Sequence, residues 1–215
     1  MGLFVTFEGI EGSGKTTQIR LAGDYLGRRG IPFLITEEPG GTALGMRLRE
    51  LLLNREPCAI CPEAELLLFA AARAQHVREV IAPALAAGKM VLCDRFADAT
   101  VVYQGYARGL DMDAIAFLNS IAAAGRQPDL TLLFDLPVEA GLRRAQARIA
   151  RLAGEPREDR FETEDLSFHI KVREGYLLLA HKNTERFRVI DAAGTVADLQ
   201  EVVRFHLDRL LLAKS

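Results

Sequence analysis

The sequence predicts an α/β protein in which a five-stranded parallel sheet is surrounded by helices. Short and nearly continuous apolar runs alternate with longer stretches of helical period along the 215 residues. A hydrophobic content of 49% is enough to build a sizeable core. A chain of this length is expected to form one domain over residues 1–215, and disorder is excluded as its main state.

Five apolar runs are expected to form strands that are buried on both faces, because polar residues do not alternate within them. These runs are residues 3–8, 33–36, 90–93, 130–136 and 187–190. Helical periodicity between them predicts helices over residues 15–29, 44–53, 62–81, 113–124, 137–151, 166–182 and 196–212. The polar residues 152–163 carry Gly154 and Pro156 and are interpreted as a mobile loop between two helices.

Charge and composition exclude several classes of function. The 27 Lys and Arg residues against 29 Asp and Glu residues give a net charge of −2, which does not favour binding of long nucleic acids or anionic membranes. The longest apolar stretch, residues 80–87, is far shorter than the roughly 18 residues that span a bilayer. Three cysteines, Cys58, Cys61 and Cys93, do not make a disulfide framework and favour a reducing, cytoplasmic location. Cys58 and Cys61 lack the second ligand pair of a structural zinc site.

A phosphate-binding motif lies at residues 9–16, where Gly-Ile-Glu-Gly-Ser-Gly-Lys-Thr fits the pattern G-x-x-x-x-G-K-[ST] between a predicted strand and a predicted helix. The glycines let successive backbone N–H groups turn towards a phosphate, and the helix N-terminus adds partial positive charge. Lys15 is expected to reach the β- and γ-phosphates, and the Thr16 hydroxyl to bind Mg²⁺. The motif therefore predicts binding of a nucleoside triphosphate, which kinases and switch proteins share.

Residues suited to an acceptor phosphate follow the third predicted strand. Asp94 and Arg95 lie at its carboxyl end, where open α/β sheets bind their ligands. Asp94 is expected to hold the magnesium shell and Arg95 to clamp a phosphate with its planar guanidinium. On the predicted helix 62–81, Phe69 and Arg73 are four residues apart and share one face, which suits a nucleotide, although an aromatic there is also typical of a core.

The order of these motifs resembles that of the bacterial thymidylate kinases over nearly the whole chain. The resemblance rests on residues 7–18 and on Glu38-Pro39-Gly40-Gly41-Thr42, Leu68-Phe69-Ala70-Ala71 with Arg73, Asp94-Arg95-Phe96, Tyr103-Gln104-Gly105, Pro128-Asp129-Leu130-Thr131, Asp159-Arg160-Phe161-Glu162 and Val189-Ile190-Asp191-Ala192. It implies a P-loop fold of the nucleoside monophosphate kinase type, with a lid at about residues 148–163. It also implies ATP-dependent phosphorylation of dTMP to dTDP, with Mg²⁺, in a homodimer.

The resemblance also implies roles for individual residues. On the donor side, it assigns ATP binding to Gly9, Ile10, Glu11, Gly12, Ser13, Gly14, Lys15, Thr16, Thr17 and Arg144, and the metal to Thr16 and Asp94. On the acceptor side, it assigns substrate binding to Glu11, Glu38, Arg49, Phe69, Arg73, Arg95, Thr100, Tyr103 and Gln104. Because residues 10–13 contain no basic side chain, catalytic arginines are expected near the lid. Lys15, Arg95, Arg148 and Arg160 form the expected catalytic set. Arg144, Arg148 and Arg160 are all candidates for stabilising the γ-phosphate, and spacing does not choose among them.

Within the acceptor site, Phe69 would stack on thymine, and Thr100 and Gln104 would meet the edge of the base. Glu11 would engage the 3′-hydroxyl, and Tyr103 would crowd the position of a 2′-hydroxyl. The side-chain amide of Gln104 matches thymine O4 and N3–H, whereas cytosine reverses that pattern. Burial of one methyl group is worth about 0.8 kcal/mol, so dUMP should react more slowly than dTMP by about tenfold or less.

Two alternatives remain open from the sequence alone. A kinase for another small nucleotide or nucleoside would use the same phosphate loop, and so would a nucleotide-gated switch protein that hydrolyses ATP slowly. Glu37 departs from the family pattern, which commonly has an arginine before Glu-Pro, so no cationic role is assigned there.

Overall fold

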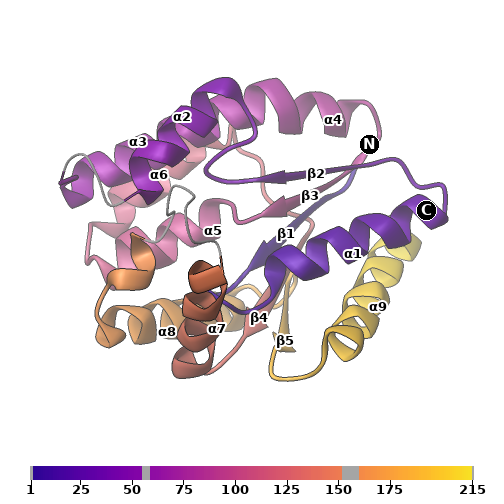
Figure 1. The fold of residues 1–215 in the computed structure, drawn as a ribbon. Helices are drawn as coiled ribbons and strands as arrows, with labels where there is room; N and C mark the ends of the chain where they lie inside the picture. The colour runs from indigo at the N-terminus through magenta and orange to yellow at the C-terminus, as the bar shows by residue number, and fades with distance from the viewer. Residues whose placement is uncertain (1, 55–58, 152–159, 215) are drawn as a thin grey trace.

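Five parallel strands form the centre of the molecule, as predicted (Figure 1). The computed structural model describes residues 2–54, 59–151 and 160–214. The strands lie in the order β2-β3-β1-β4-β5 and comprise β1 (Phe4–Glu8), β2 (Phe33–Glu37), β3 (Met90–Asp94), β4 (Leu130–Asp135) and β5 (Phe187–Asp191). Each strand lies within a residue or two of its predicted bounds, because continuous apolar runs leave little choice between strand and loop.

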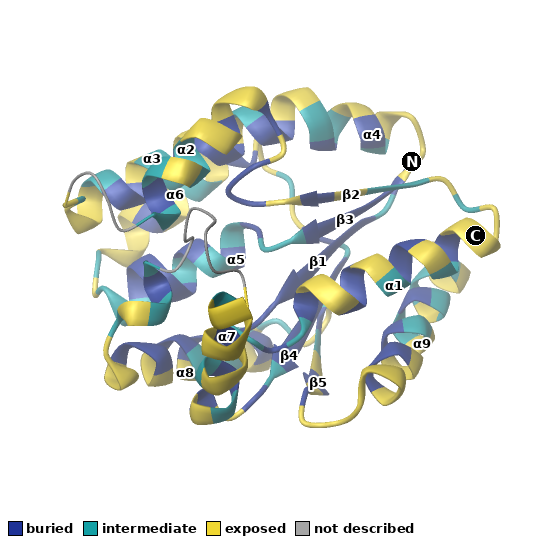
Figure 2. Ribbon diagram, in the orientation of Figure 1, coloured by how far each residue is buried: buried dark blue, intermediate teal, exposed yellow. Residues whose placement is uncertain are grey.

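Apolar side chains from both faces of the sheet make the core. All five residues of β1 are buried, which the burial colouring of Figure 2 shows for the middle of the sheet. Val5 and Phe7 belong to the larger apolar cluster, while Phe4 packs in a smaller one with Val91 and Cys93. Alternate residues of one strand thus enter different clusters, which explains why its sequence is apolar throughout.

Helices cover both faces of this sheet. They are α1 (Lys15–Arg28), α2 (Ala43–Leu53), α3 (Pro62–His76), α4 (Ala82–Ala86), α5 (Ala97–Thr100), α6 (Met112–Ala122), α7 (Val138–Arg151), α8 (Leu166–Lys182) and α9 (Val196–Lys214). Helices α1 and α9 pack against each other, and α3 packs between α2 and α6 (Figure 1). None of the described helices is long and apolar enough to cross a membrane.

The helix predicted over residues 62–81 continues further than expected. A π-helical turn, η1 (Val77–Ile81), joins α3 to α4, and the Ala82 N–H bonds to the carbonyl of Val77, five residues earlier. Pro83 follows directly and has no N–H to donate. A widened turn at this point lets the chain continue as helix through the proline.

A second helical segment was not predicted at all. Helix α5 and the π-helical segment η2 (Val101–Ala107) connect β3 to α6. The β-branched residues Thr100 and Val101 and the interior Gly105 oppose a helix by local propensity. Tertiary contacts override that preference, since η2 packs against α8 and α6 and buries Val102 and Tyr103.

The remaining predicted loop, residues 152–163, lies largely outside the described residues. Its last part forms a short 3₁₀ turn, η3 (Phe161–Thr163), which buries Phe161. Residues 148–151, at the start of the predicted lid, belong to helix α7.

Candidate active site

The phosphate loop connects β1 to α1 at the carboxyl edge of the sheet, where residues 9–16 form a tight turn. Gly9, Gly12 and Gly14 have φ values of 140°, 71° and 93°. A Cβ atom on Gly12 would lie 2.1 Å from the carbonyl oxygen of Gly141 in α7. The left-handed backbone and the close approach of α7 therefore both require glycine at position 12.

Lys15 lies folded over this loop. Its ammonium group donates to the carbonyl oxygens of Gly9 and Ile10 at 3.0 and 2.8 Å, and to Ser13 Oγ at 3.3 Å. Burial lowers the pKa of Lys15 to about 8. A phosphate group could replace these neutral oxygen partners with charged ones, which would stabilise the protonated lysine.

Thr16 and Asp94 form a pair of hard oxygen ligands between the first turn of α1 and the end of β3. The Thr16 hydroxyl donates to Asp94 Oδ2 at 3.0 Å. A hydroxyl and a carboxylate, completed by phosphate oxygens and water, make the donor set that Mg²⁺ prefers. The described residues hold no cluster of three or more His, Cys, Asp or Glu side chains that would bind a metal without such help.

Arg95 directs its guanidinium towards the phosphate loop. Its φ of 69° is in the left-handed region, and its Nη2 donates to Glu11 Oε1 at 2.9 Å. The guanidinium carbon lies 4.9 Å from the centroid of the Tyr103 ring, and the Tyr103 hydroxyl also donates to Glu11 Oε1. Strained backbone at a non-glycine residue is typical of a side chain that must point in one direction for function.

The side chains around Glu11 determine its ionisation. Burial alone would raise its pKa, but His169, Arg95 and Lys15 together hold the pKa of Glu11 well below its usual range. His169 Nδ1 lies 3.4 Å from Glu11 Oε2. Glu11 is therefore a carboxylate within the phosphate loop that carries charge at neutral pH.

A second buried carboxylate, Glu38, is bound to Arg73. Arg73 Nε donates to Glu38 Oε2 at 2.7 Å, and its terminal nitrogens donate to Asn119 Oδ1, the Phe96 carbonyl and the Thr100 hydroxyl at 2.7, 3.1 and 3.0 Å. Only 2% of the surface of Arg73 is exposed. Four of its donors are used within the protein, so its predicted role in substrate binding stays a prediction.

The β2–α2 connection is held by Arg49. Arg49 Nη1 donates to the Pro39 carbonyl at 2.8 Å and lies 3.1 Å from Glu37 Oε2. Glu37, the residue that departs from the family pattern, is thus an ion-pair partner of Arg49, which is one of the predicted substrate-binding residues. The Glu38 N–H donates to the Asp94 carbonyl at 3.0 Å, which brings this connection beside the end of β3.

The predicted base-binding residues lie around an aromatic cluster. The Phe69 and Phe161 ring centroids are 6.3 Å apart, and those of Tyr103 and Phe161 are 5.4 Å apart. Gln104 is 1% exposed, and its Nε2 donates to Glu65 Oε1 at 2.8 Å. The cluster joins side chains of α3, η2 and η3 that the sequence separates widely.

The two candidate catalytic arginines have different neighbours. Arg148 Nη2 donates to Glu162 Oε1 at 3.3 Å. The pKa of Glu162 is raised mainly by burial and also by the negative charge of Glu11. Arg160 Nη2 instead donates to Glu65 Oε2 at 2.6 Å. Arg148 therefore lies on the side of the phosphate loop, and Arg160 on the side of α3.

Arg144 lies on α7 between the phosphate loop and β5. Its Nη1 donates to the carbonyl of Ala192, directly after β5, at 3.2 Å. This position borders the loop on the side away from Arg95, which suits its predicted contact with ATP. The neighbouring residues 152–159, which include the middle of the predicted lid, are outside the described part of the chain.

Two acidic residues that the sequence did not single out lie at the centre of these contacts. Glu8 ends β1, accepts hydrogen bonds from the Phe96 N–H and the Tyr176 hydroxyl at 2.8 and 2.7 Å, and has its pKa raised to about 8 by burial and by the charge of Asp98. Glu65 is fully buried in the first turn of α3. An acidic residue near a helix N-terminus is common on its own account, so local sequence carried no signal for Glu65.

Comparison with known proteins identifies the family. The sequence model of the thymidylate kinases matches residues 7–203. The chain belongs to the thymidylate kinase family. It is 58% identical to the thymidylate kinase of Syntrophus aciditrophicus (strain SB), over 98% of this chain and 96% of the relative. It is 57% identical to that of Desulfosudis oleivorans, over 92% of each chain.

A solved thymidylate kinase has the same fold. The crystal structure of the enzyme from Ehrlichia chaffeensis superposes with a TM-score of 0.74 at 33% sequence identity, over 96% of this chain and 98% of that one. The expected P-loop fold of the nucleoside monophosphate kinase type is therefore confirmed.

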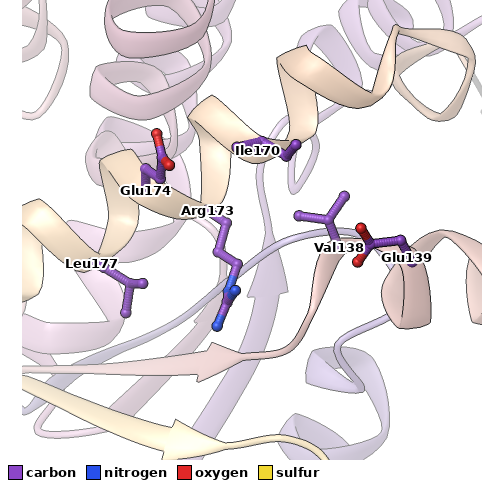
Figure 3. A pocket seen from close by; sticks show the side chains of 6 residues that line it. All are labelled: Val138, Glu139, Ile170, Arg173, Glu174 and Leu177. Carbon is purple, nitrogen blue, oxygen red and sulfur yellow. The ribbon is translucent and has the colours of Figure 1, made fainter.

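A separate surface hollow lies between the start of α7 and helix α8 (Figure 3). Val138 and Glu139 face Ile170 and Arg173 across it, and its volume is ≈ 130 Å³. Ligand pockets are usually about 300–1,000 Å³, so a nucleotide would not fit there. Arg173 is bound to both oxygens of Asp135 at 2.7 and 2.9 Å, and none of the predicted site residues lines the hollow.

Proposed function

We propose that this chain transfers the γ-phosphoryl group of ATP directly to dTMP, which gives dTDP for the synthesis of dTTP. One observation carries the proposal: Lys15, at the start of α1, and Arg95, directly after β3, are two cations that both act on the Glu11 carboxylate at the carboxyl edge of the sheet. One cation suits the donor triphosphate and the other the acceptor monophosphate. In-line transfer needs such an alignment and little covalent chemistry from the protein.

On the donor side, residues 9–17 cradle the phosphates of ATP and Arg144 contacts the nucleotide. Thr16 and Asp94 would hold Mg²⁺, which when bound neutralises charge on the phosphates. Their hydrogen bond of 3.0 Å supports this role, because it already brings the hydroxyl and the carboxylate together.

On the acceptor side, Arg95 binds the monophosphate with help from Arg49 and the Arg73–Glu38 pair. Phe69 stacks on thymine, with Thr100 and Gln104 at its edge. Glu11 accepts a hydrogen bond from the 3′-hydroxyl, and its ionised state supports this role. Tyr103 fills the space of a 2′-hydroxyl, which would disfavour ribonucleotides.

Arg148 and Arg160 supply positive charge to the transferring phosphoryl group. An arginine that arrives in the transition state accelerates such a reaction by about 10³–10⁵. The pairing of Arg148 with Glu162, near Glu11, favours Arg148 for this contact. Arg160 would first have to leave Glu65 and the Leu52 carbonyl.

A homodimer is the proposed assembly. Leu67 on α3 and Phe117 and Ile121 on α6 are 56%, 66% and 60% exposed, on two helices that pack against each other. A face of large apolar side chains is typical of a protein–protein interface. Sedimentation of the purified chain at twice its 23.7 kDa mass would support this assembly.

The cytoplasm is the proposed location. Both cysteines that the structure describes, Cys61 and Cys93, are free thiols, which suits a reducing compartment.

A coupled assay of ADP release tests the function, with dTMP, dUMP, dCMP, UMP, AMP and GMP as acceptors. We expect fastest turnover with dTMP, slower turnover with dUMP by about tenfold or less, and strong rejection of dCMP. Lys15→Ala should abolish turnover. Faster use of another acceptor would replace the proposal by a different kinase, and phosphate release without any acceptor would favour a switch protein.

A further inference from the structure

Glu65 is a fully buried acidic side chain on the acceptor side of the sheet. It is 0% exposed and receives hydrogen bonds from three residues of two other segments. Gln104 Nε2 and Arg108 Nε donate to its Oε1 at 2.8 and 3.2 Å. Arg160 and Arg108 donate to its Oε2 at 2.6 and 3.3 Å. A buried carboxylate with this many hydrogen-bond partners holds the side chains around it in fixed positions.

The chemistry of this carboxylate constrains the Gln104 amide. Both oxygens of Glu65 accept hydrogen bonds from guanidinium groups, and a carboxylate bound in this way offers only acceptors to Gln104. If the Gln104 amide turned over, its oxygen would face Glu65 Oε1 at about the same distance, and two acceptors would repel each other. Glu65 therefore forces Gln104 to turn its NH₂ group towards α3 and its Oε1 in the other direction.

We propose that Glu65 is a positioning residue that sets base selectivity by fixing the orientation of the Gln104 amide. The inference rests on the proposed function, in which Gln104 meets the edge of the base. Thymine and uracil present an N3–H donor, which the fixed Oε1 accepts. Cytosine presents an unprotonated N3 acceptor, which the same oxygen repels.

The variant Glu65→Gln tests this role. A glutamine at position 65 can donate as well as accept, so Gln104 can adopt either orientation, and one of them suits cytosine. We expect the ratio of dCMP to dUMP inhibition constants, measured against dTMP, to shift by about tenfold in favour of dCMP. The dTMP to dUMP ratio should change less than twofold, because both bases present the same N3–H and O4. The KM for ATP should not change.

Two controls separate positioning from general disruption. Glu164→Gln removes a carboxylate that binds the same Arg108 at 2.6 Å, whereas Gln104 donates to Glu65, so this variant should leave the ratio unchanged. In a Gln104→Leu background, Glu65→Gln should shift the ratio less than twofold, because the residue through which it acts is absent. If the Glu65→Gln variant does not fold, the double variant Glu65→Gln with Arg108→Gln restores the charge balance. This double variant is then compared in place of Glu65→Gln, both with Gln104 present and in the Gln104→Leu background.

The results that would overturn the inference are distinct from a failure of the proposed function. An unchanged ratio in a folded Glu65→Gln variant would overturn it, as would an equal shift with Glu164→Gln or in the Gln104→Leu background. In each case the wild-type chain would still convert dTMP and reject dCMP. A wild-type chain that does not convert dTMP would instead refute the function itself.

Discussion

Replacement of Gly12 by alanine should destabilise the protein more than the same change at a glycine of equal backbone conformation. Gly12 has φ +71°, and its added Cβ would lie 2.1 Å from the Gly141 oxygen and 3.1 Å from the Ala145 nitrogen. The left-handed conformation alone costs an L-residue about 1–2 kcal/mol. Forcing α7 away from the loop adds about 1–3 kcal/mol, so the free energy of unfolding should fall by about 2–5 kcal/mol.

The matched control is Gly30→Ala, at the end of α1. Gly30 has φ +68° and open space around an added Cβ, so only the conformational cost of about 1–2 kcal/mol applies. Urea unfolding of the ligand-free proteins, extrapolated to water, measures both changes. Gly12→Ala should also weaken ATP binding, whereas Gly30→Ala should not. Equal losses of stability in the two variants would refute the reasoning, because they would mean that α7 can move away from position 12 without any loss of folding free energy.

Two further outcomes are expected. Since burial lowers the pKa of Lys15 to about 8, and phosphate oxygens favour its charged form, ATP binding at pH 8 should take up about half a proton. ATP affinity should accordingly fall as the pH rises from 7 to 9. Calorimetry in buffers of different ionisation enthalpy measures the uptake, and Lys15→Ala should lack it. Arg73→Met should lower the free energy of unfolding by about 3–5 kcal/mol, because it removes the guanidinium that binds Glu38 in the interior and leaves this carboxyl group with His76 Nδ1, at 2.9 Å, as its side-chain partner. Glu38→Gln in the Arg73→Met background should recover part of that loss, and urea unfolding showing no recovery would contradict this explanation.

Much of the donor site was predictable because its residues are neighbours in the sequence. Lys15 and Thr16 follow a strand and a glycine-rich loop, so one local motif predicts both their proximity and their chemistry. Asp94 and Arg95 required one additional assumption, namely that parallel strands end at the same edge of the sheet.

The helix of residues 97–107 shows where local reasoning fails. Thr100, Val101 and Gly105 argue against a helix, yet contacts with α6 and α8 make one. Tyr103 and Gln104 were assigned by resemblance, and nothing in the local pattern indicates that they lie on a helix. Burial of the segment supplies free energy that single-residue propensities do not contain.

The sequence by itself determined the five strands, most of the helices and the chemistry of the phosphate loop, because periodicity and short motifs act over a few residues. Only the tertiary structure decided how the acceptor side is held together. Glu65 meets Gln104, Arg108 and Arg160, which are 39, 43 and 95 residues away. Contacts of that range form only when helices from separate parts of the chain pack together, so no local pattern records them.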